Sequence, residues 1–237
     1  MNSSTQGERG WEFGFYYRIK MKNQISKIMQ LLESNYLDKN RTTLNSMRQN
    51  PDPFKILVSC LISLRTQDKN TAIASNRLFA QATTPQQIIK LPLKKLEKLI
   101  YSSGHYKKKS RILKSVSKEI LERFNNKVPQ SEEELLTIKG VGRKTANIVR
   151  RFAYNKSDAL PVDVNVHRVV NRLGWVQTKD ADKSEEELRN ILPKKFWEEF
   201  NATMILHGKS ICVPISPKCS QCMISQYCPR VGVGKSR

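Results

Sequence analysis

Apolar residues along most of this chain recur at steps of three and four, the spacing that places side chains on one face of an α-helix. No segment alternates between apolar and polar residues as a half-buried strand does. The pattern therefore predicts an all-α fold, and residues 1–20, which show neither period, are expected to form a disordered N-terminal tail. The clearest helical stripes are Ile25, Ile28, Met29, Leu32 and Tyr36; Phe54, Leu57, Val58, Leu61 and Ile62; Ile112, Leu113, Val116, Ile120 and Phe124; and Phe196, Trp197, Phe200 and Met204.

Capping residues mark the predicted starts of several helices. A capping residue followed by proline, whose missing N–H costs nothing in the first turn, occurs at Asp52 and again at Thr84. Gln87 can complete a capping box with Thr84. The same box signature, a serine followed three residues later by glutamate, begins at Ser131 and at Ser184, so these two serines are predicted N-caps.

The charge balance points to a polyanionic partner. The 237 residues include 42 Lys and Arg against 21 Asp and Glu, a formal net charge of +21, with 38% hydrophobic residues. This composition excludes an acidic solvating protein and a fully disordered chain. Since no apolar run reaches the roughly 18 residues of a membrane span, we expect no membrane association. Nucleic acid is the first partner to consider.

Basic residues gather in runs at 107–111, 143–144 and 150–151. Lys109 and Arg143, which lie in the first two runs, are candidates for contacts with backbone phosphates. The alternative for each run is a solvated basic face.

The stretch from Leu135 to Val149 indicates a helix, a glycine turn and a second helix. Gly140 and Gly142 flank one apolar residue and permit a tight turn. The unpaired N–H groups at the start of the second helix can bind a phosphate oxygen, which grips the nucleic-acid backbone without sequence preference. A plain connection between two helices explains the same pattern.

Lys144 lies in the first turn of this second helix. The positive end of the helix dipole disfavours its ammonium form, and burial would add to that effect. Its amine could then act as a nucleophile at neutral pH. The alternative is a lysine that only contacts phosphate.

Asp163 follows a short apolar segment and precedes another helical pattern, so it is a candidate N-cap. A carboxylate at this place could also stabilise positive charge that develops on a sugar, or help to activate an attacking group. The sequence alone leaves both roles open.

Four of the five cysteines lie close together near the end of the chain, with the spacing C-x6-C-x2-C-x5-C. They are Cys212, Cys219, Cys222 and Cys228. No secretory signal is present, and in a reducing compartment such a cluster more often binds a metal than forms disulfides. Four thiolates suit either zinc or an iron–sulfur cluster. Cys60, in an apolar run, is expected to be a small buried side chain.

Three of these stretches together resemble the endonuclease III family of DNA glycosylases. They are the Gly-Val-Gly-Arg-Lys-Thr-Ala-Asn hairpin, Val162-Asp163 with Arg168 after it, and the cysteine spacing after Leu206-His207-Gly208. The resemblance covers about residues 21–230 and implies a helix-hairpin-helix glycosylase fold with a DNA-binding cleft between two helical domains. It implies a six-helix domain at 46–156, a second domain at 21–45 plus 157–230 that carries a 4Fe-4S cluster, and a basic C-terminal tail at 231–237.

The resemblance also implies the chemistry. Lys144 matches the catalytic lysine of the family and Asp163 its catalytic aspartate, while the four clustered cysteines would bind the 4Fe-4S cluster as a structural group. A damaged pyrimidine would be flipped out of double-stranded DNA, removed through a lysine Schiff base, and the strand cleaved 3′ to the abasic site by β-elimination. Gly140 and Gly142 would hold phosphate beside the lesion.

Several positions depart from the family pattern. Asn165 stands where the family usually has histidine, which resembles relatives that remove adenine or thymine from mismatches. Arg65 occupies the position of a gap-filling glutamine, and His105 that of an aliphatic wedge residue. Lys218 is the one cation between the first two clustered cysteines. We expect Arg65, His105 and Lys218 to contact DNA.

The main prediction is therefore a bifunctional DNA glycosylase and AP lyase for oxidised or damaged pyrimidines and abasic sites, acting as a monomer. The first alternative is a monofunctional glycosylase specific for adenine or thymine mismatches. The second is a non-enzymatic DNA-binding module. Because the chain lacks a signal or transit pattern, we expect an intracellular location at the cytoplasm or nucleoid.

Overall fold

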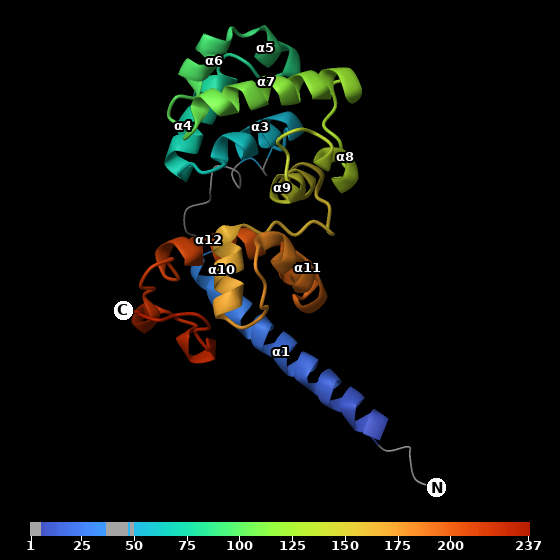
Figure 1. Ribbon diagram of the computed structural model, residues 1–237, viewed down its shortest axis with the longest axis vertical. Coiled ribbons are helices and arrows are strands. Elements are labelled where there is room, and N and C mark those ends of the chain that lie inside the picture. The colour runs from blue at the N-terminus through green and yellow to red at the C-terminus, as the bar shows by residue number, and fades with distance from the viewer. Residues whose placement is uncertain (1–5, 37–46, 48–49) are drawn as a thin grey trace. The chain divides into compact units, whose positions relative to one another are not determined.

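The computed structural model describes the backbone of residues 6–36, 47 and 50–237, and side chains within these ranges from residue 21 onward. Every regular element in this part of the chain is helical, so the predicted all-α fold is confirmed (Figure 1). Two compact units are formed, which we name the hairpin unit (residues 41–161) and the cysteine unit (residues 1–40 with 162–237). No helix of the described residues is long and apolar enough to cross a membrane.

The hairpin unit is built around one apolar helix. Its elements are α3 (Pro53–Ser63), α4 (Asp68–Phe79), α5 (Pro85–Lys90), α6 (Leu93–Leu99), α7 (Tyr106–Arg123), α8 (Glu132–Leu136) and α9 (Arg143–Tyr154). α3 is buried along almost its whole length because α4, α7 and α9 pack against it. Its stripe from Phe54 to Ile62 lies in the core of the unit, as the periodicity predicts. α9 is thereby held against the central helix of the unit.

The predicted helix starts in this unit are confirmed. The side chain of Asp52 accepts a hydrogen bond from the backbone N–H of Lys55 at 3.0 Å. Thr84 and Gln87 form the complete capping box at the start of α5. Ser131 accepts from the N–H of Glu134 at the start of α8. These caps satisfy N–H groups that have no partner inside the helix.

The cysteine unit is built around its last α-helix. Its elements are α1 (Gln6–Tyr36), α10 (Val164–Arg172), α11 (Ala181–Ile191), η2 (Lys194–Phe196), α12 (Trp197–Ser210), η3 (Cys219–Gln221) and η4 (Ser225–Tyr227). α12 lies against α1 and α10, and the predicted apolar stripe of α1 is buried. α1 begins at Gln6, whereas the sequence predicts a disordered tail to residue 20. Residues 6–36 contain no proline, so nothing blocks the helix that forms at the buried stripe from extending towards Gln6.

The predicted N-cap at Ser184 is wrong. α11 begins one turn earlier, where the side chain of Asp180 accepts from the N–H of Lys183 at 2.9 Å. Ser184 is fully buried inside the helix and its hydroxyl contacts Nδ1 of His167 at 2.7 Å. A tertiary hydrogen bond thus uses the hydroxyl that the local pattern assigns to the helix start.

The segment 231–237 packs beside the cysteine loop, the name we use for residues 212–228, and beside the end of α10. The N–H of Val231 donates to the carbonyl of Arg172 at 3.1 Å. Arg237 donates its backbone N–H to Pro217 and accepts from the N–H of Ser220. Backbone hydrogen bonds therefore give these residues a defined path beside the cysteines.

Candidate active site and cysteine loop

The turn between α8 and α9 is anchored by apolar residues and exposes its glycines. Ile138 and Val141 are buried in the core, while Gly140 and Gly142 face solvent. Gly140 has a φ of +98°, and an added Cβ would lie 2.9 Å from Cγ2 of Ile112. No side chain caps α9 at Gly142, and a Cβ there would meet open space. The turn has the form expected for a phosphate-binding hairpin.

Lys144 is the second residue of α9 and is half-buried. Two effects act on the pKa of the Cys60 thiol in α3: burial raises it, and the positive charge of nearby Lys144 lowers it. Burial dominates and raises the pKa of Cys60 to about 12. Cys60 is 2% exposed, so the prediction of a small buried side chain is confirmed. The packing of α3 against α9 thus fixes the helix turn that carries Lys144.

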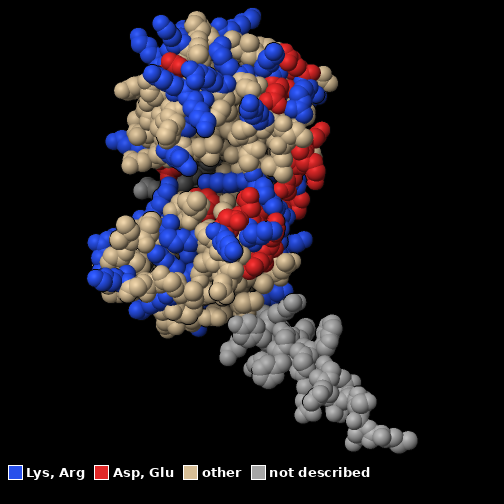
Figure 2. All heavy atoms as spheres, viewed as in Figure 1, with Lys and Arg blue, Asp and Glu red and all other residues tan. Residues whose placement is uncertain are grey.

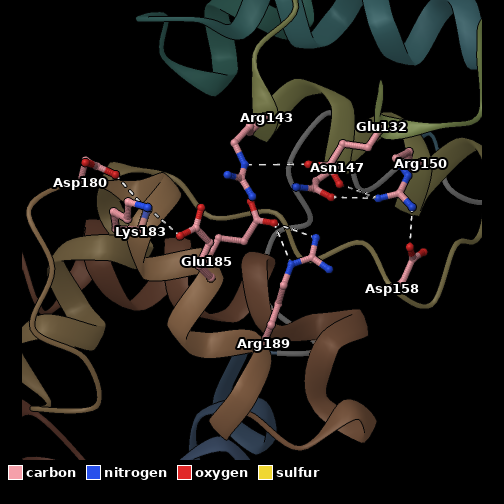
Figure 3. A network of polar contacts seen from close by, with 10 residues as sticks. Glu132, Arg143, Asn147, Arg150, Asp158, Asp180, Lys183, Glu185 and Arg189 are labelled. Carbon is pink, nitrogen blue, oxygen red and sulfur yellow. Dashed lines mark hydrogen bonds and ion pairs between the residues drawn. The ribbon is translucent and has the colours of Figure 1, made fainter. Parts of the chain in front are cut away.

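Acidic residues of the hairpin unit pair with the arginines of α9 (Figure 3). Arg150 is buried and donates to Glu132 at 3.1 Å and to Asp158 at 2.5 Å. Nε of Arg143 lies 3.8 Å from the carboxylate of Glu132. Arg150 therefore has a structural role instead of the phosphate contact that its basic run suggests. The predicted DNA contact of Arg143 stays a prediction.

Asp163 is the N-cap of α10 and is almost completely buried. Its Oδ1 accepts from the N–H of Asn165 at 2.8 Å and of Val166 at 3.0 Å. Its Oδ2 accepts from Nδ2 of Asn165 at 3.3 Å. The capping role is thus present, and a carboxylate in this environment can still stabilise positive charge. Asp163 belongs to the cysteine unit and Lys144 to the hairpin unit.

Asn165 links Asp163 to the cysteine loop, a role that sequence reasoning missed. Its side-chain carbonyl accepts from Nη2 of Arg168 at 3.1 Å. Arg168 also donates to the carbonyls of Gly208 at 2.8 Å and Cys212 at 3.1 Å. The close approach of α10 and α12 needs Gly208, where an added Cβ would lie 3.1 Å from Cβ of Asn165. Partners 40 or more residues away along the chain define this link, so no local signal reveals it.

The four clustered cysteines line one pocket that opens to solvent. Arg172 and His207 also line it. Arg172 donates to Sγ of Cys212 at 3.3 Å, and Nε2 of His207 lies 3.8 Å from Sγ of Cys222. All five thiols of the chain are free. That these four residues bind one metal centre stays a prediction.

The sulfur atoms influence one another without converging on a single ion. Burial raises the pKa of Cys222, and the charges of the other three clustered cysteines raise it further. Burial likewise raises the pKa of Cys228. Among the described residues, no three His, Cys, Asp or Glu side chains are grouped tightly enough for one metal ion. Raised pKa values keep these thiols protonated, so binding of a metal group here would release protons.

Two of the predicted DNA contacts lie on exposed loops of the hairpin unit. Arg65 and His105 are exposed and both have left-handed backbones, with φ of 52° and 57°. Lys218 is half-buried at the rim of the cysteine pocket in the other unit. Figure 2 shows Lys and Arg side chains over much of the visible face of each unit, in keeping with the net charge.

The predicted DNA contact of Lys109 is wrong. Its side chain is only 5% exposed and its Nζ donates to the carbonyl of Ile62 at 2.5 Å and to Oγ1 of Thr66 at 2.7 Å. The neighbouring lysines 107 and 108 are exposed on the outer face of α7. Because a basic run on a helix points to several faces, one of its members here turns inward.

Comparisons with known proteins give the class first. Residues 58–194 match the family described as HhH-GPD superfamily base excision DNA repair protein. The matched segment includes the hairpin, Lys144 and Asp163. The fold and the hairpin therefore define a helix-hairpin-helix protein of base excision DNA repair.

The relatives then give the family. The chain is 42% identical over 189 residues to endonuclease III of Thermotoga maritima. This aligned region covers 78% of this chain and 88% of that protein. A trapped covalent intermediate of endonuclease III with DNA matches with a TM-score of 0.79 and 30% identity, over 88% of this chain and 96% of the other. The chain belongs to the endonuclease III family, whose members are DNA glycosylases with lyase activity.

A thermostable thymine-DNA glycosylase has the same fold, with a TM-score of 0.77 over 89% of this chain and 96% of the other. Its 24% identity supports the fold alone.

Proposed function

We propose that the chain removes oxidised or otherwise damaged pyrimidines from double-stranded DNA and cleaves the strand at the resulting abasic site, acting as a monomer. The observation that carries this proposal is Lys144 in the first turn of α9, directly after an exposed glycine turn that can hold phosphate. Membership of the endonuclease III family supports the reaction class. The lesion and the residue roles are our assignments.

DNA would bind first through its backbone. The N–H groups at the start of α9, where no side chain caps the helix, would hold a phosphate oxygen beside the lesion. Exposed Arg65 and His105 would contact the duplex at the damaged pair, with Lys218 and Arg143 adding phosphate contacts. The damaged nucleotide is then flipped out of the stack at a cost of a few kcal/mol, which is smaller for a lesion than for an intact pair.

Lys144 supplies the nucleophile. The lone pair of its neutral amine forms a bond to C1′ while the bond from C1′ to the base breaks, and the base leaves with that electron pair and takes up a proton. Loss of an amine proton and opening of the sugar ring give an imine. Water then takes up a C2′ proton, the electrons of that C–H bond form a double bond between C2′ and C3′, and the bond from C3′ to oxygen breaks so that its electron pair leaves with the 3′ phosphate. Water hydrolyses the imine and frees the lysine.

Asp163 would stabilise the positive charge that develops on the sugar as the base leaves. Three hydrogen bonds hold its carboxylate in one orientation, two from backbone N–H groups and one from Asn165. A carboxylate fixed in this way needs no reorganisation during the reaction.

The four clustered cysteines would hold a 4Fe-4S cluster. The four sulfurs line one pocket, and four cysteine thiolates are the ligand set of a 4Fe-4S cluster. The cluster would supply structural cross-linking of the loop that carries Lys218. A brown protein with visible absorption supports this assignment, whereas a colourless protein with stoichiometric zinc after anaerobic purification refutes it.

Borohydride trapping on duplexes with an abasic site or thymine glycol tests the reaction. We expect a covalent adduct with the wild-type chain and none with Lys144→Gln. Lys139→Gln is the matched control, because it removes an exposed positive charge from the same hairpin and should still give the adduct. Trapping that survives Lys144→Gln assigns the imine to another amine and overturns the proposal.

Asn165 favours a second candidate, a largely monofunctional glycosylase for mismatches. That activity predicts faster base release from a mismatched duplex than from oxidised pyrimidine, with strand cleavage lagging behind. A protein that only binds DNA predicts salt-sensitive binding and no base release on any lesion. Measuring base release and strand cleavage over one panel of duplexes distinguishes all three.

A further inference from the structure

Lys109 is a buried lysine at the start of α7 that the reaction does not use. Its two hydrogen-bond acceptors are uncharged, the carbonyl of Ile62 and the hydroxyl of Thr66. Burial lowers the pKa of this lysine to about 8. Ile62 lies in the last turn of α3, so the lysine serves as a side-chain cap for a helix C-terminus, where positive charge is favourable.

The hydroxyl of Thr66 joins this lysine to two loops. It donates to the carbonyl of Leu64 at 3.3 Å within its own loop, residues 64–67. It also accepts from the N–H of Gly104 at 3.1 Å, in the second loop, residues 102–105. With the bond from Lys109, its one donor and both acceptor positions are used.

The backbones of the two loops touch. A Cβ added at Gly104 would lie 2.9 Å from the carbonyl oxygen of Arg65, so only glycine permits this approach. Ser102 of the second loop donates its hydroxyl to the carbonyl of Asn70 at 3.1 Å, in α4, the helix that follows the first loop. The two loops are thus held together by side-chain and backbone contacts.

Each loop presents one exposed side chain from a left-handed backbone, Arg65 from the first and His105 from the second. This conformation costs a non-glycine residue about 1–2 kcal/mol and persists when the surrounding structure enforces it. Thr66 directly follows Arg65 in the chain. Its hydroxyl accepts from Lys109 and from the N–H of Gly104, the residue before His105. The contacts around this hydroxyl therefore define the directions of both side chains.

We propose that Lys109 is a positioning residue which, through the hydroxyl of Thr66, holds the 64–67 and 102–105 loops as one rigid element, so that Arg65 and His105 act together on duplex DNA during base flipping. This inference rests on the proposed function. Loss of the link leaves the nucleophile in place but slows opening of the duplex. Base removal from a stacked pair depends on that opening more strongly than cleavage at an abasic site, which has no base to unstack.

Four variants separate positioning from stability. Lys109→Met removes the charge and both hydrogen bonds, and Thr66→Val removes the hydroxyl at similar volume. Thr66→Ser restores the hydroxyl. Tyr154→Phe is the matched control, because it removes a hydrogen bond to Val128 in the same unit at residues outside the two loops.

The measurements are single-turnover base release from a thymine-glycol duplex and single-turnover cleavage at a preformed abasic site, with urea denaturation of each variant. We expect Lys109→Met and Thr66→Val to slow base release by about tenfold or more and abasic-site cleavage by less than about threefold, since small displacements of positioning groups are costly. Thr66→Ser should retain most of the rate. The double variant Lys109→Met with Thr66→Val should be no slower than the worse single variant, because both changes break one link.

The outcomes divide cleanly. If the wild-type chain releases no base and forms no borohydride adduct, the proposed function fails. If the wild type is active and both loop variants slow the two reactions equally, or no more than Tyr154→Phe does, the positioning role is overturned and Lys109 is only a stabilising residue. Thr66→Val decides the matter should Lys109→Met not fold.

Discussion

Arg172 donates from its guanidinium to Sγ of Cys212 at 3.3 Å and, with the same nitrogen, to the carbonyl of Val213 at 2.8 Å. A further bond reaches the carbonyl of Pro214. One arginine of α10 thus holds the beginning of the cysteine loop by its backbone and by a sulfur that we assign to the cluster.

Arg172→Met should therefore weaken retention of the proposed 4Fe-4S cluster. The change removes a charge-assisted hydrogen bond to a proposed ligand and the bonds to the carbonyls of Cys212, Val213 and Pro214 that orient the loop. Such outer contacts typically affect metal affinity by about 10–100-fold. The measurement is the rate at which visible absorption disappears in the presence of a chelator. Lys179→Met, which removes an exposed cation of the same unit, is the control and should match the wild type. Equal rates for all three proteins would contradict the role given to Arg172.

Asp163→Asn should separate the two roles of Asp163. Asparagine is as good an N-cap as aspartate, so the free energy of unfolding should change by less than about 1 kcal/mol. The negative charge is lost, and base release should fall by about 10²–10⁴-fold if the carboxylate stabilises the transition state. Urea denaturation and single-turnover base release give the two values. An active Asp163→Asn enzyme would reduce this residue to a capping role.

The glycine turn predicts two different responses to alanine. Gly140→Ala combines a positive φ with a contact at 2.9 Å to Ile112, so it should destabilise the protein by about 1–3 kcal/mol. Gly142→Ala meets no neighbouring atom and should cost less than about 1 kcal/mol. Gly142→Ala should also weaken binding to undamaged duplex, because its methyl group enters the open space where phosphate is proposed to approach. Chemical denaturation and fluorescence anisotropy measure the two effects.

Gly142→Ala is the sharper test of phosphate binding at the turn. Unchanged DNA affinity in this folded variant would place the phosphate elsewhere.

The buried amine of Lys109 predicts a pH-dependent stability. Burial lowers its pKa in the folded protein to about 8, against 10.5 for the ordinary side chain. Between these values the unfolded chain binds more protons at this lysine than the folded chain does, so a rise in pH favours the folded state. The free energy of unfolding of the wild type, minus that of Lys109→Met, should therefore increase from pH 8 to pH 10.5. A difference that stays flat over this range would mean that the amine is not desolvated.

Local patterns predict much of this fold. The apolar stripe of α3 and the caps at Asp52, Thr84 and Ser131 depend on residues a few positions apart, and the structure confirms them. Ser184 has the same local signature, yet its hydroxyl is used by His167 of another helix. Capping signatures therefore predict a helix start only where no tertiary partner competes for the side chain.

The candidate site is predictable in its parts but not in its links. The glycine turn, Lys144 and the cysteine spacing are visible in the sequence, and their roles come from the likeness to a family. The inward turn of Lys109 and the bridge made by Asn165 depend on acceptors and donors far along the chain, such as Ile62 and Gly208. No periodicity or spacing carries that information.

Cys60 is buried, whereas the other four cysteines of the chain are partly exposed, so the five thiols differ in their access to reagents. A reagent that alkylates thiols in the native protein cannot reach this core sulfur, whose high pKa also keeps it unreactive. Alkylation of the folded chain therefore counts only the loop cysteines that are not bound to iron. Comparing native with denatured samples turns this difference into a direct assay of how completely a preparation has been loaded.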